Sequence, residues 1–239
     1  MKKIKALRLY PDALDLYGDS KNLTVLGQRL HESGAELEIA YNNGDEDISL
    51  DGVDMVYISH GKARNLAHVW EHFHKNGDKI VRAIENGTLF LVTGNAQELF
   101  GRTFSDTSGS FLEGLGLFRY DTIEDNSVQV SDMLLEPVFA PQEKCYGFMN
   151  RTAHMTGEHK YPLFKVISGV SDDTTQNHAE GTLYKNYFGT WAMGPVLARN
   201  PVLMREILRR LLGEDYRELD FSLEEQALSM VLSEFKVKQ

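Results

Sequence analysis

The order of apolar segments in the first hundred residues is the feature that most constrains the fold. Short β-forming runs alternate there with stretches whose apolar residues recur at helical spacing. The predicted strands cover residues 5–10, 36–39, 55–59 and 88–93. Alternation of strand and helix favours parallel strands joined by crossover helices. We therefore predict an α/β fold of three layers, with a mainly parallel twisted sheet and helices on both faces.

Helical periodicity places the connections between these strands. Three leucines predict a helix over residues 20–33, which ends before Gly34, and Asp19 or Ser20 is well placed to cap its start. A longer helical pattern precedes the fourth strand, running through Val69, Phe73, Ile80 and Ile84. We expect this pattern to form one long helix.

The second half of the chain is richer in β than in α signals. Short β-forming runs separated by polar turns cover residues 116–122, 127–134, 145–150 and 164–168. Two helices are predicted after them, over 201–212 and from Ser222, where the residues have the form of a capping box. Since no linker or repeat interrupts the pattern, we expect residues 1–239 to form a single domain with extra β-rich segments.

Composition narrows the functional classes. A net charge of −10 without clustered Lys and Arg argues against nucleic-acid binding. No run of about 18 apolar residues is present, which argues against a membrane span. The single cysteine, Cys145, excludes an internal disulfide and fits a reducing compartment. We expect a cytoplasmic protein without a cofactor.

The apolar run 88–92 leads into a turn that begins with Thr93 and Gly94. A sharp strand-to-helix turn can present a nucleophile, and ligands of parallel sheets bind at the carboxyl ends of the strands. We therefore take Thr93 as the candidate catalytic position.

Several ordered blocks resemble class I glutamine amidotransferases of the cobyric acid synthase (CobB/CobQ) type, and among these the glutaminase subunits of lipid II isoglutaminyl synthases. The blocks include Tyr10–Asp19, Glu113–Leu117 and Gly189–Pro201. The resemblance implies a flavodoxin-like fold, glutamine or another small amide as ligand, and a role in peptidoglycan synthesis. It also implies a Mur-ligase-like, ATP-dependent synthetase as the partner that receives ammonia.

Such enzymes are expected to use a cysteine thiolate at the strand-to-helix turn, a helper histidine and backbone N–H groups that hold the oxyanion. In this sequence the cysteine position aligns with Thr93, and the histidine position aligns with Met193, ahead of Gly194-Pro195. The segment Gln97 to Gly101 is one residue longer than the expected spacing, so an offset of one residue at the turn stays open.

The loop expected to hold the oxyanion departs as well. A glycine-rich stretch is expected there, but the chain has Ser59-His60-Gly61-Lys62. Backbone N–H groups survive in this loop and at the turn. The residues expected to line a ligand site are therefore Ser59, Gly61, Gly94, Asn95 and Gln97.

These departures predict a loss of glutamine hydrolysis. A threonine hydroxyl is far harder to ionise than a thiol, whose reference pKa is about 8.5, and methionine has no nitrogen that accepts a proton. Loss of both members of a catalytic unit typically removes about 10⁶ of rate in other hydrolases. We therefore favour a silenced amidotransferase that acts as a partner-binding or regulatory subunit.

Other interpretations stay open. The chain could be an active amidohydrolase or amidotransferase in which Thr93 or Ser59 attacks and His60 is the base, or a sensor that binds glutamine without turnover. Cys145 lies outside the turn and is better read as a small buried hydrophobic residue. His154, His159 and His178 match no zinc spacing and are read as exposed loop residues, so no metal site is predicted.

Overall fold

The computed structural model describes residues 1–172 and 178–237. Its sheet begins with five parallel strands in the spatial order β2-β1-β3-β4-β11. These are β1 (Lys2–Leu9), β2 (Ala35–Asn42), β3 (Met55–Ile58), β4 (Leu89–Thr93) and β11 (Tyr187–Thr190). All residues of β3, β4 and β11 are buried, as expected for strands covered on both sides. The α/β fold predicted from the alternating segments is confirmed.

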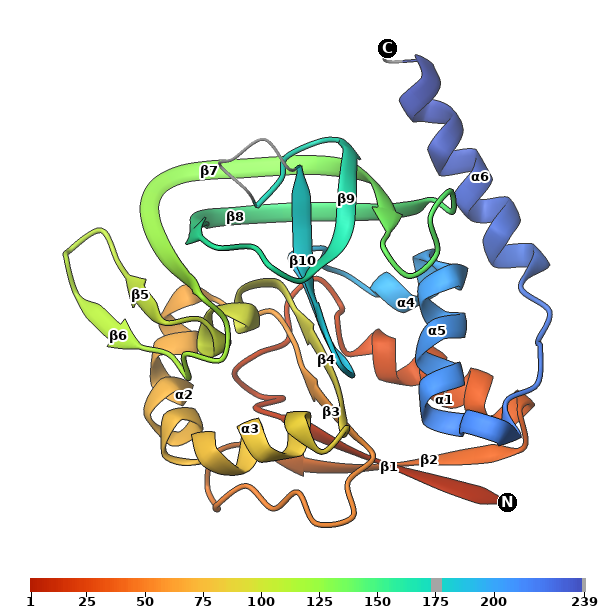
Figure 1. Cartoon of the computed structure of the whole chain (residues 1–239), viewed down its shortest axis with the longest axis horizontal. Coiled ribbons are helices and arrows are strands. Elements are labelled where there is room, and N and C mark those ends of the chain that lie inside the picture. Colours follow the sequence, from red (N-terminus) through yellow and green to blue (C-terminus); the bar gives the residue numbers. More distant parts are fainter. Residues whose placement is uncertain (173–177, 238–239) are drawn as a thin grey trace.

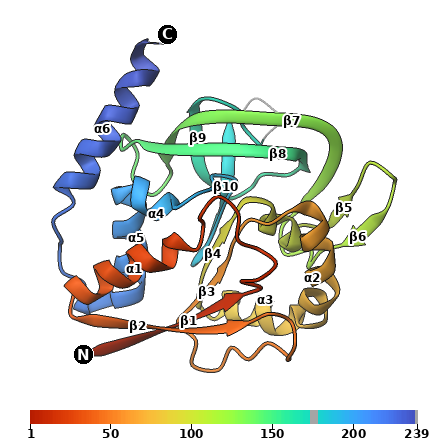
Figure 2. The same cartoon turned by 180° about the vertical axis from the view of Figure 1, so that it is seen from behind.

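Helices cover both faces of the parallel strands (Figures 1 and 2). One group lies beside β1 and β2, and its helices contact one another. It comprises α1 (Lys21–Glu32), α4 (Val196–Arg199) and α5 (Pro201–Leu212). The other group contains α2 (Ala63–Lys75) and α3 (Gly77–Glu85), which connect β3 to β4.

The single long helix predicted before β4 is wrong, because the helix is interrupted at Asn76. The side chain of Asn76 bonds to backbone groups of two segments: its Oδ1 accepts from the N–H of Ile48, in the connection after β2, at 3.1 Å, and its Nδ2 donates to the carbonyl of His72, in α2, at 2.9 Å. Gly77 follows, and a Cβ there would lie 2.6 Å from Cδ2 of Leu115. Side-chain competition for backbone groups therefore ends α2 and starts α3 in a new direction.

The sheet continues beyond β11 with mostly antiparallel strands. They are β10 (Ala179–Tyr184), β9 (Pro162–Ser168), β7 (Tyr120–Pro137), β8 (Cys145–Gly157), β5 (Thr103–Ser105) and β6 (Phe111–Glu113). The sequence did not predict β10 or β11 as strands.

The two runs predicted at 116–122 and 127–134 are not separate strands. Residues 120–137 form one strand, β7, which bends over the top of the molecule in Figure 1 and pairs with β8 on both sides of a register shift. The shift lies between Glu124 and Gln129, where Asn126 has a φ of 63°. A bulge of this kind lets a strand bend without ending.

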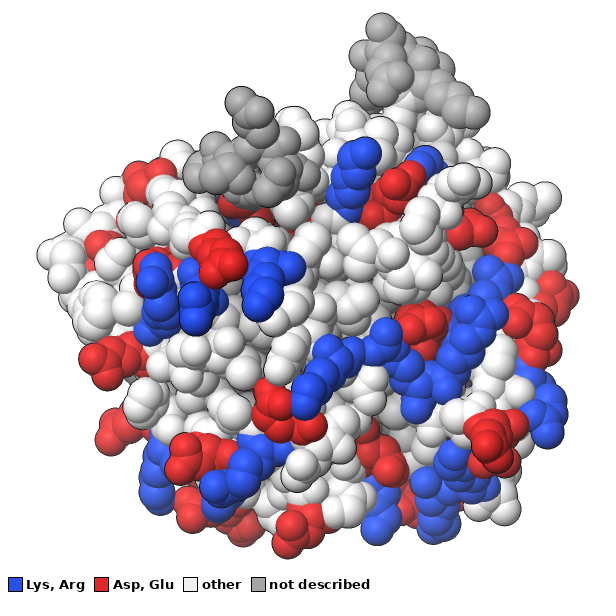
Figure 3. Space-filling model, viewed as in Figure 1, with Lys and Arg blue, Asp and Glu red and all other residues white. Residues whose placement is uncertain are grey.

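The remaining elements are the 3₁₀ helices η1 (Gly94–Phe100) and η2 (Gly213–Asp215) and the C-terminal helix α6 (Ser222–Val237). Helix α6 extends away from the body of the protein (Figure 1), and the carboxylate of Asp220 accepts from the N–H of Ser222 at its start. Within the described residues no helix is long and apolar enough to cross a membrane. Lys and Arg are interspersed with Asp and Glu on the face shown in Figure 3.

Candidate functional site

The candidate site lies where three connections leave the carboxyl ends of neighbouring parallel strands. Strand β1 lies between β2 and β3, so the chain leaves it on one side and returns on the other. Ligands of open α/β sheets bind at such a switch point. The loop after β1, the loop after β3 and the turn after β4 meet here, and they carry residues 10–19, 59–62 and 93–94.

The turn after β4 has its unusual conformation at Gly94. Thr93 is extended, with φ −114° and ψ 145°, whereas Gly94 has a φ of 61°. A residue in the left-handed region between a strand and a helix is the hallmark of a nucleophile elbow. The conformation of an elbow is therefore found at Gly94, one residue after Thr93, which the sequence aligned with the catalytic cysteine.

His60 fills the space in front of this elbow. A Cβ added to Gly94 would lie 2.6 Å from both Cβ and Cγ of His60, closer than real side chains approach one another. The ring also accepts a hydrogen bond from the backbone of the residue after Gly94: the N–H of Asn95 donates to Nδ1 of His60 at 3.1 Å. His60 thus occupies the place of a side chain at residue 94 and bonds to the N–H beside it.

The backbone N–H groups around the turn have internal partners. In an elbow, the N–H of the residue after the nucleophile and one from a neighbouring loop hold the oxyanion. Here the first, that of Asn95, donates to His60, and the N–H of Gly61 donates to Oδ1 of Asn95 at 3.0 Å. The amide of Asn95 also donates to the carbonyl of Gly61 at 2.9 Å. Both donors are therefore occupied by the chain's own side chains.

Burial determines the protonation state of His60. The residue is only 7% exposed, and its ring lies 5.8 Å from the ring of Tyr17. Burial lowers the pKa of His60 to about 4, so the ring is neutral at physiological pH. A neutral ring that accepts at Nδ1 carries its proton on Nε2.

Asp19 organises the same site and was not predicted to do so. Its Oδ2 accepts from Oγ1 of Thr93 at 2.7 Å and from the N–H of His60 at 3.3 Å, whereas its Oδ1 has no partner among the described residues. Burial raises the pKa of Asp19 to about 7, against the opposing hydrogen bonds. Neither Asp19 nor Ser20 caps α1 through its side chain, so the predicted helix cap is wrong.

The other predicted residues are not arranged around a common reacting atom. The hydroxyl of Ser59 donates to the carbonyl of Leu14, and that of Thr93 donates to Asp19. Gln97 is fully buried, and its amide has no hydrogen-bond partner in the described structure. Met193 is buried and donates its N–H to the carbonyl of Phe148 at 2.9 Å.

A cavity of about 270 Å³ opens beside the elbow. Of the predicted residues, His60, Gly61 and Asn95 line it. The wall is completed by residues that sequence reasoning did not select for the site, among them Glu98, Glu124, Asn150 and Arg151. Glu98 and Arg151 are ionisable residues that are buried in the fold. Their burial depends on long-range contacts and is not visible in the sequence.

Cys145 and the histidines of the second half do not join this site. Cys145 is fully buried in β8, and burial raises the pKa of its thiol well above the ordinary value. The expectation of an exposed side chain is wrong for His159, which is 7% exposed and lies 3.7 Å from Asp172. Within residues 1–172 and 178–237 no group of three His, Cys, Asp or Glu side chains is placed to hold a metal ion.

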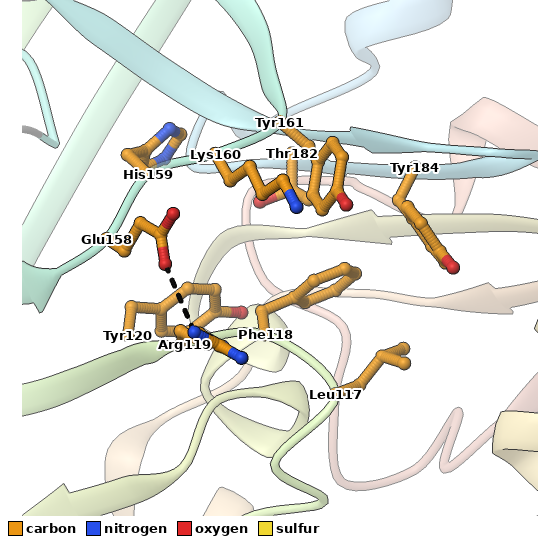
Figure 4. A pocket seen from close by; sticks show the side chains of 10 residues that line it. All are labelled: Leu117, Phe118, Arg119, Tyr120, Glu158, His159, Lys160, Tyr161, Thr182 and Tyr184. Atoms are coloured by element: carbon orange, nitrogen blue, oxygen red, sulfur yellow. Dashed lines mark ion pairs between the residues drawn. The ribbon is translucent and has the colours of Figure 1, made fainter.

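A second pocket, of about 250 Å³, lies apart from the strand ends (Figure 4). Tyr161 and Tyr184 form one side and Phe118 the other, and Arg119 pairs with Glu158 at the rim at 3.8 Å. The residues predicted for catalysis and ligand binding lie outside this pocket.

Known proteins are similar to this chain over nearly its whole length. Residues 6–201 match the CobB/CobQ-like glutamine amidotransferase domain. Two relatives are each named lipid II isoglutaminyl synthase (glutamine-hydrolyzing) subunit GatD. The one from Streptococcus pneumoniae is 23% identical over 235 residues, which cover 97% of this chain and 90% of the relative. The one from Staphylococcus aureus is 27% identical over 241 residues, which cover 97% and 96%.

A solved structure gives the same picture of the fold. A chain of the structure of PurLQS from Thermotoga maritima superposes with a TM-score of 0.50 at 15% identity, covering 97% of this chain and 100% of that chain. At this level of identity, the likeness shows a shared fold.

Proposed function

This chain belongs to the CobB/CobQ-like glutamine amidotransferase family, and we propose that it is a catalytically silent member that acts as a partner-binding or regulatory subunit. The observation that carries the proposal is the position of His60 against Gly94. The elbow residue has no side chain, and the ring of His60 lies where a nucleophile's side chain would stand.

Two further features support the loss of hydrolysis. The N–H groups of Asn95 and Gly61, which would hold an oxyanion, already donate to side chains of this protein. Removal of one oxyanion donor alone costs about 10²–10³ in rate in a well-studied protease. Met193, at the position expected for the helper histidine, offers no atom that accepts a proton.

The alternative of a replacement nucleophile finds little support in the geometry. The Thr93 hydroxyl is buried and donates to Asp19, and the Ser59 hydroxyl donates to a backbone carbonyl. A general base must lie within hydrogen-bond reach of the group that it deprotonates, and Asp19 meets this condition for Thr93, but the Thr93 hydroxyl does not line the cavity beside the elbow. His60 instead uses Nδ1 for the N–H of Asn95.

The partner is proposed from the relatives. Both are named subunits of a lipid II isoglutaminyl synthase, so we place this chain beside a Mur-ligase-like synthetase in peptidoglycan synthesis. Co-elution of the purified chain with such a synthetase in size-exclusion chromatography tests this part. Separate elution at concentrations of tens of micromolar would contradict it.

Loss of catalysis is tested by glutamate release from L-glutamine. We expect the unmodified protein to show no release above background. A variant with Gly94→Cys, His60→Gly and Met193→His places a thiol at the elbow, clears the space in front of it and restores an imidazole. We expect this variant to gain measurable glutaminase activity.

The matched control keeps His60 and Gly94 and carries Thr93→Cys with Met193→His. Because residue 93 is an extended strand residue whose side chain faces Asp19, we expect no gain of activity from this control. Robust release of glutamate by the unmodified protein would contradict the proposal.

A further inference from the structure

The pocket of Figure 4 combines three aromatic walls with two cationic side chains at its rim. Phe118, Tyr161 and Tyr184 supply the rings, and Arg119 and Lys160 supply the charges. This pocket and the cavity beside the elbow have no lining residue in common. Pockets for small molecules are typically lined by apolar and aromatic side chains with a few convergent polar groups. The aromatic pocket therefore has the composition of a ligand site of its own.

Contacts outside the pocket fix its aromatic walls in place. The ring of Phe118, a residue that is 5% exposed, packs against that of Tyr187 with the ring centres 4.9 Å apart. The hydroxyl of Tyr184 donates to Oε1 of Glu85 at 2.9 Å. The ring of Tyr161 packs on that of Tyr184 with the centres 5.0 Å apart, but Tyr161 remains 37% exposed. One large aromatic side chain thus stays open to solvent at the mouth of the pocket.

Backbone hydrogen bonds join the segments that carry these walls. The N–H of Glu158, in the connection from β8 to β9, donates to the carbonyl of Arg119, just before β7, at 3.2 Å. The N–H of Leu183, in β10, donates to the carbonyl of Tyr161 at 2.8 Å. Because the walls are already in position, little ordering of the protein is needed when a ligand binds.

The charges at the rim leave one cation without a carboxylate. Arg119 lies 3.8 Å from Glu158, and both side chains are exposed. Lys160 has no ion pair within residues 1–172 and 178–237, and its Nζ lies 5.1 Å from the centre of the Tyr161 ring. In Figure 4 the side chain of Lys160 runs along the same side of the pocket as Tyr161. A positive charge is therefore available next to the exposed aromatic wall.

We propose that this pocket binds a small aromatic anion, with its ring against Phe118, Tyr161 and Tyr184 and its carboxylate held by Lys160. Aromatic pairs contribute beyond the area that they bury, and a hydrogen bond between two charged groups is stronger than one between neutral groups. The volume of about 250 Å³ lies below the range of about 300–1,000 Å³ that is typical of ligand pockets, which favours a ligand with a single ring. This inference does not rest on the proposed loss of catalysis or on the proposed partner.

Three probes separate the contribution of the ring from that of the charge. Benzoate has both, benzamide has the ring without the charge, and cyclohexanecarboxylate has the charge without an aromatic ring. Each is titrated into the full chain and followed by protein NMR shifts. We expect benzoate to bind at least about fivefold more tightly than either of the others. Because Lys160 is exposed, the affinity for benzoate should also fall as salt is added.

Variants of exposed residues locate the groups that bind without disturbing the core. Lys160→Gln should weaken benzoate binding about fivefold and leave benzamide binding unchanged, whereas Lys160→Arg should retain both. Tyr161→Ala should weaken both aromatic probes. Glu158→Gln should strengthen benzoate binding about twofold to threefold, because it removes a repelling carboxylate and releases Arg119. The matched control is Lys21→Gln, which removes a charge outside the pocket and should change neither affinity.

Benzoate binding no tighter than that of benzamide or of cyclohexanecarboxylate would overturn the proposal. So would the absence of saturable shifts with benzoate, or benzoate binding unaffected by Lys160→Gln. Glutamate release and co-elution with a synthetase are measured separately and report on the proposed function, so failure of one does not imply failure of the other.

Discussion

The ring of His60 occupies the space that a side chain on Gly94 would need. The two residues lie at the ends of neighbouring strands, 34 positions apart, and His60 also accepts from the N–H of the residue after Gly94. A glycine at residue 94 makes room for the imidazole, and the imidazole leaves no room for a nucleophile. The protein's own groups therefore occupy the space where the side chain of a nucleophile would lie.

Gly94→Ala tests this steric relationship through stability. A β-carbon at a φ of 61° costs about 1–2 kcal/mol, and crowding against the ring adds about 1–3 kcal/mol. We expect the cost to fall when His60→Gly is also present, with a coupling of about 1–3 kcal/mol in a double-mutant cycle measured by urea unfolding. Additive effects of the two substitutions would show that the residues do not compete for space.

Asp19→Asn tests the buried acid that joins the loops. The folded-state pKa of Asp19 is raised to about 7, so its protonated form is favoured by folding. Its contribution to stability is therefore fully present below about pH 4 and is lost as pH rises through 7. We expect the unmodified protein to lose up to roughly 4 kcal/mol relative to Asp19→Asn between pH 4 and 8. Parallel stability curves for the two proteins would contradict a raised pKa.

Thr93 is expected to matter for folding rather than for catalysis. Thr93→Val removes the hydroxyl that donates to Asp19 at 2.7 Å and leaves the carboxyl with fewer partners. We expect a loss of about 1–3 kcal/mol in the free energy of unfolding. Thr93→Ser keeps the donor and serves as the control, with a smaller loss. If both variants were equally destabilised, packing rather than the hydrogen bond would be responsible.

Arg151 and Asp172 form a buried ion pair, in which each residue neutralises the charge of the other. Arg151→Met leaves Asp172 charged in a buried place, and we expect a loss of about 3–5 kcal/mol. Adding Asp172→Leu removes the stranded charge and should recover most of that loss. Thermal unfolding of the two variants measures the difference, and a double variant as unstable as Arg151→Met would argue against the pair.

Four of the five parallel strands followed from the sequence, because their signals are local, whereas β11 did not. The apolar runs of β1, β3 and β4 and the leucine spacing of α1 report secondary structure directly. The break at Asn76 did not follow, because it depends on bonds from its side chain to residues 48 and 72. The continuity of β7 depends on its pairing with β8, which is a long-range contact.

The residues predicted for the site lie at the strand ends, but the contact of His60 with Gly94 was not foreseen. The alignment left a one-residue offset open at the turn, and only the φ of 61° identifies Gly94 as the elbow residue. The contact of His60 with Gly94 and the hydrogen bond from Thr93 to Asp19 cannot be predicted from local sequence. They join three separate loops. Glu98 was missed because its place in the cavity wall depends on the folded chain.

The most direct test of the silent site is covalent trapping by a glutamine analogue whose side chain ends in a diazomethyl ketone, read out by intact mass. A reactive thiolate or alkoxide at the elbow would form a stable adduct with this reagent. We expect no adduct on the unmodified protein and one adduct at residue 94 in the variant with Gly94→Cys, His60→Gly and Met193→His. A stoichiometric adduct on the unmodified protein would mean that a nucleophile is present and that His60 does not close the site.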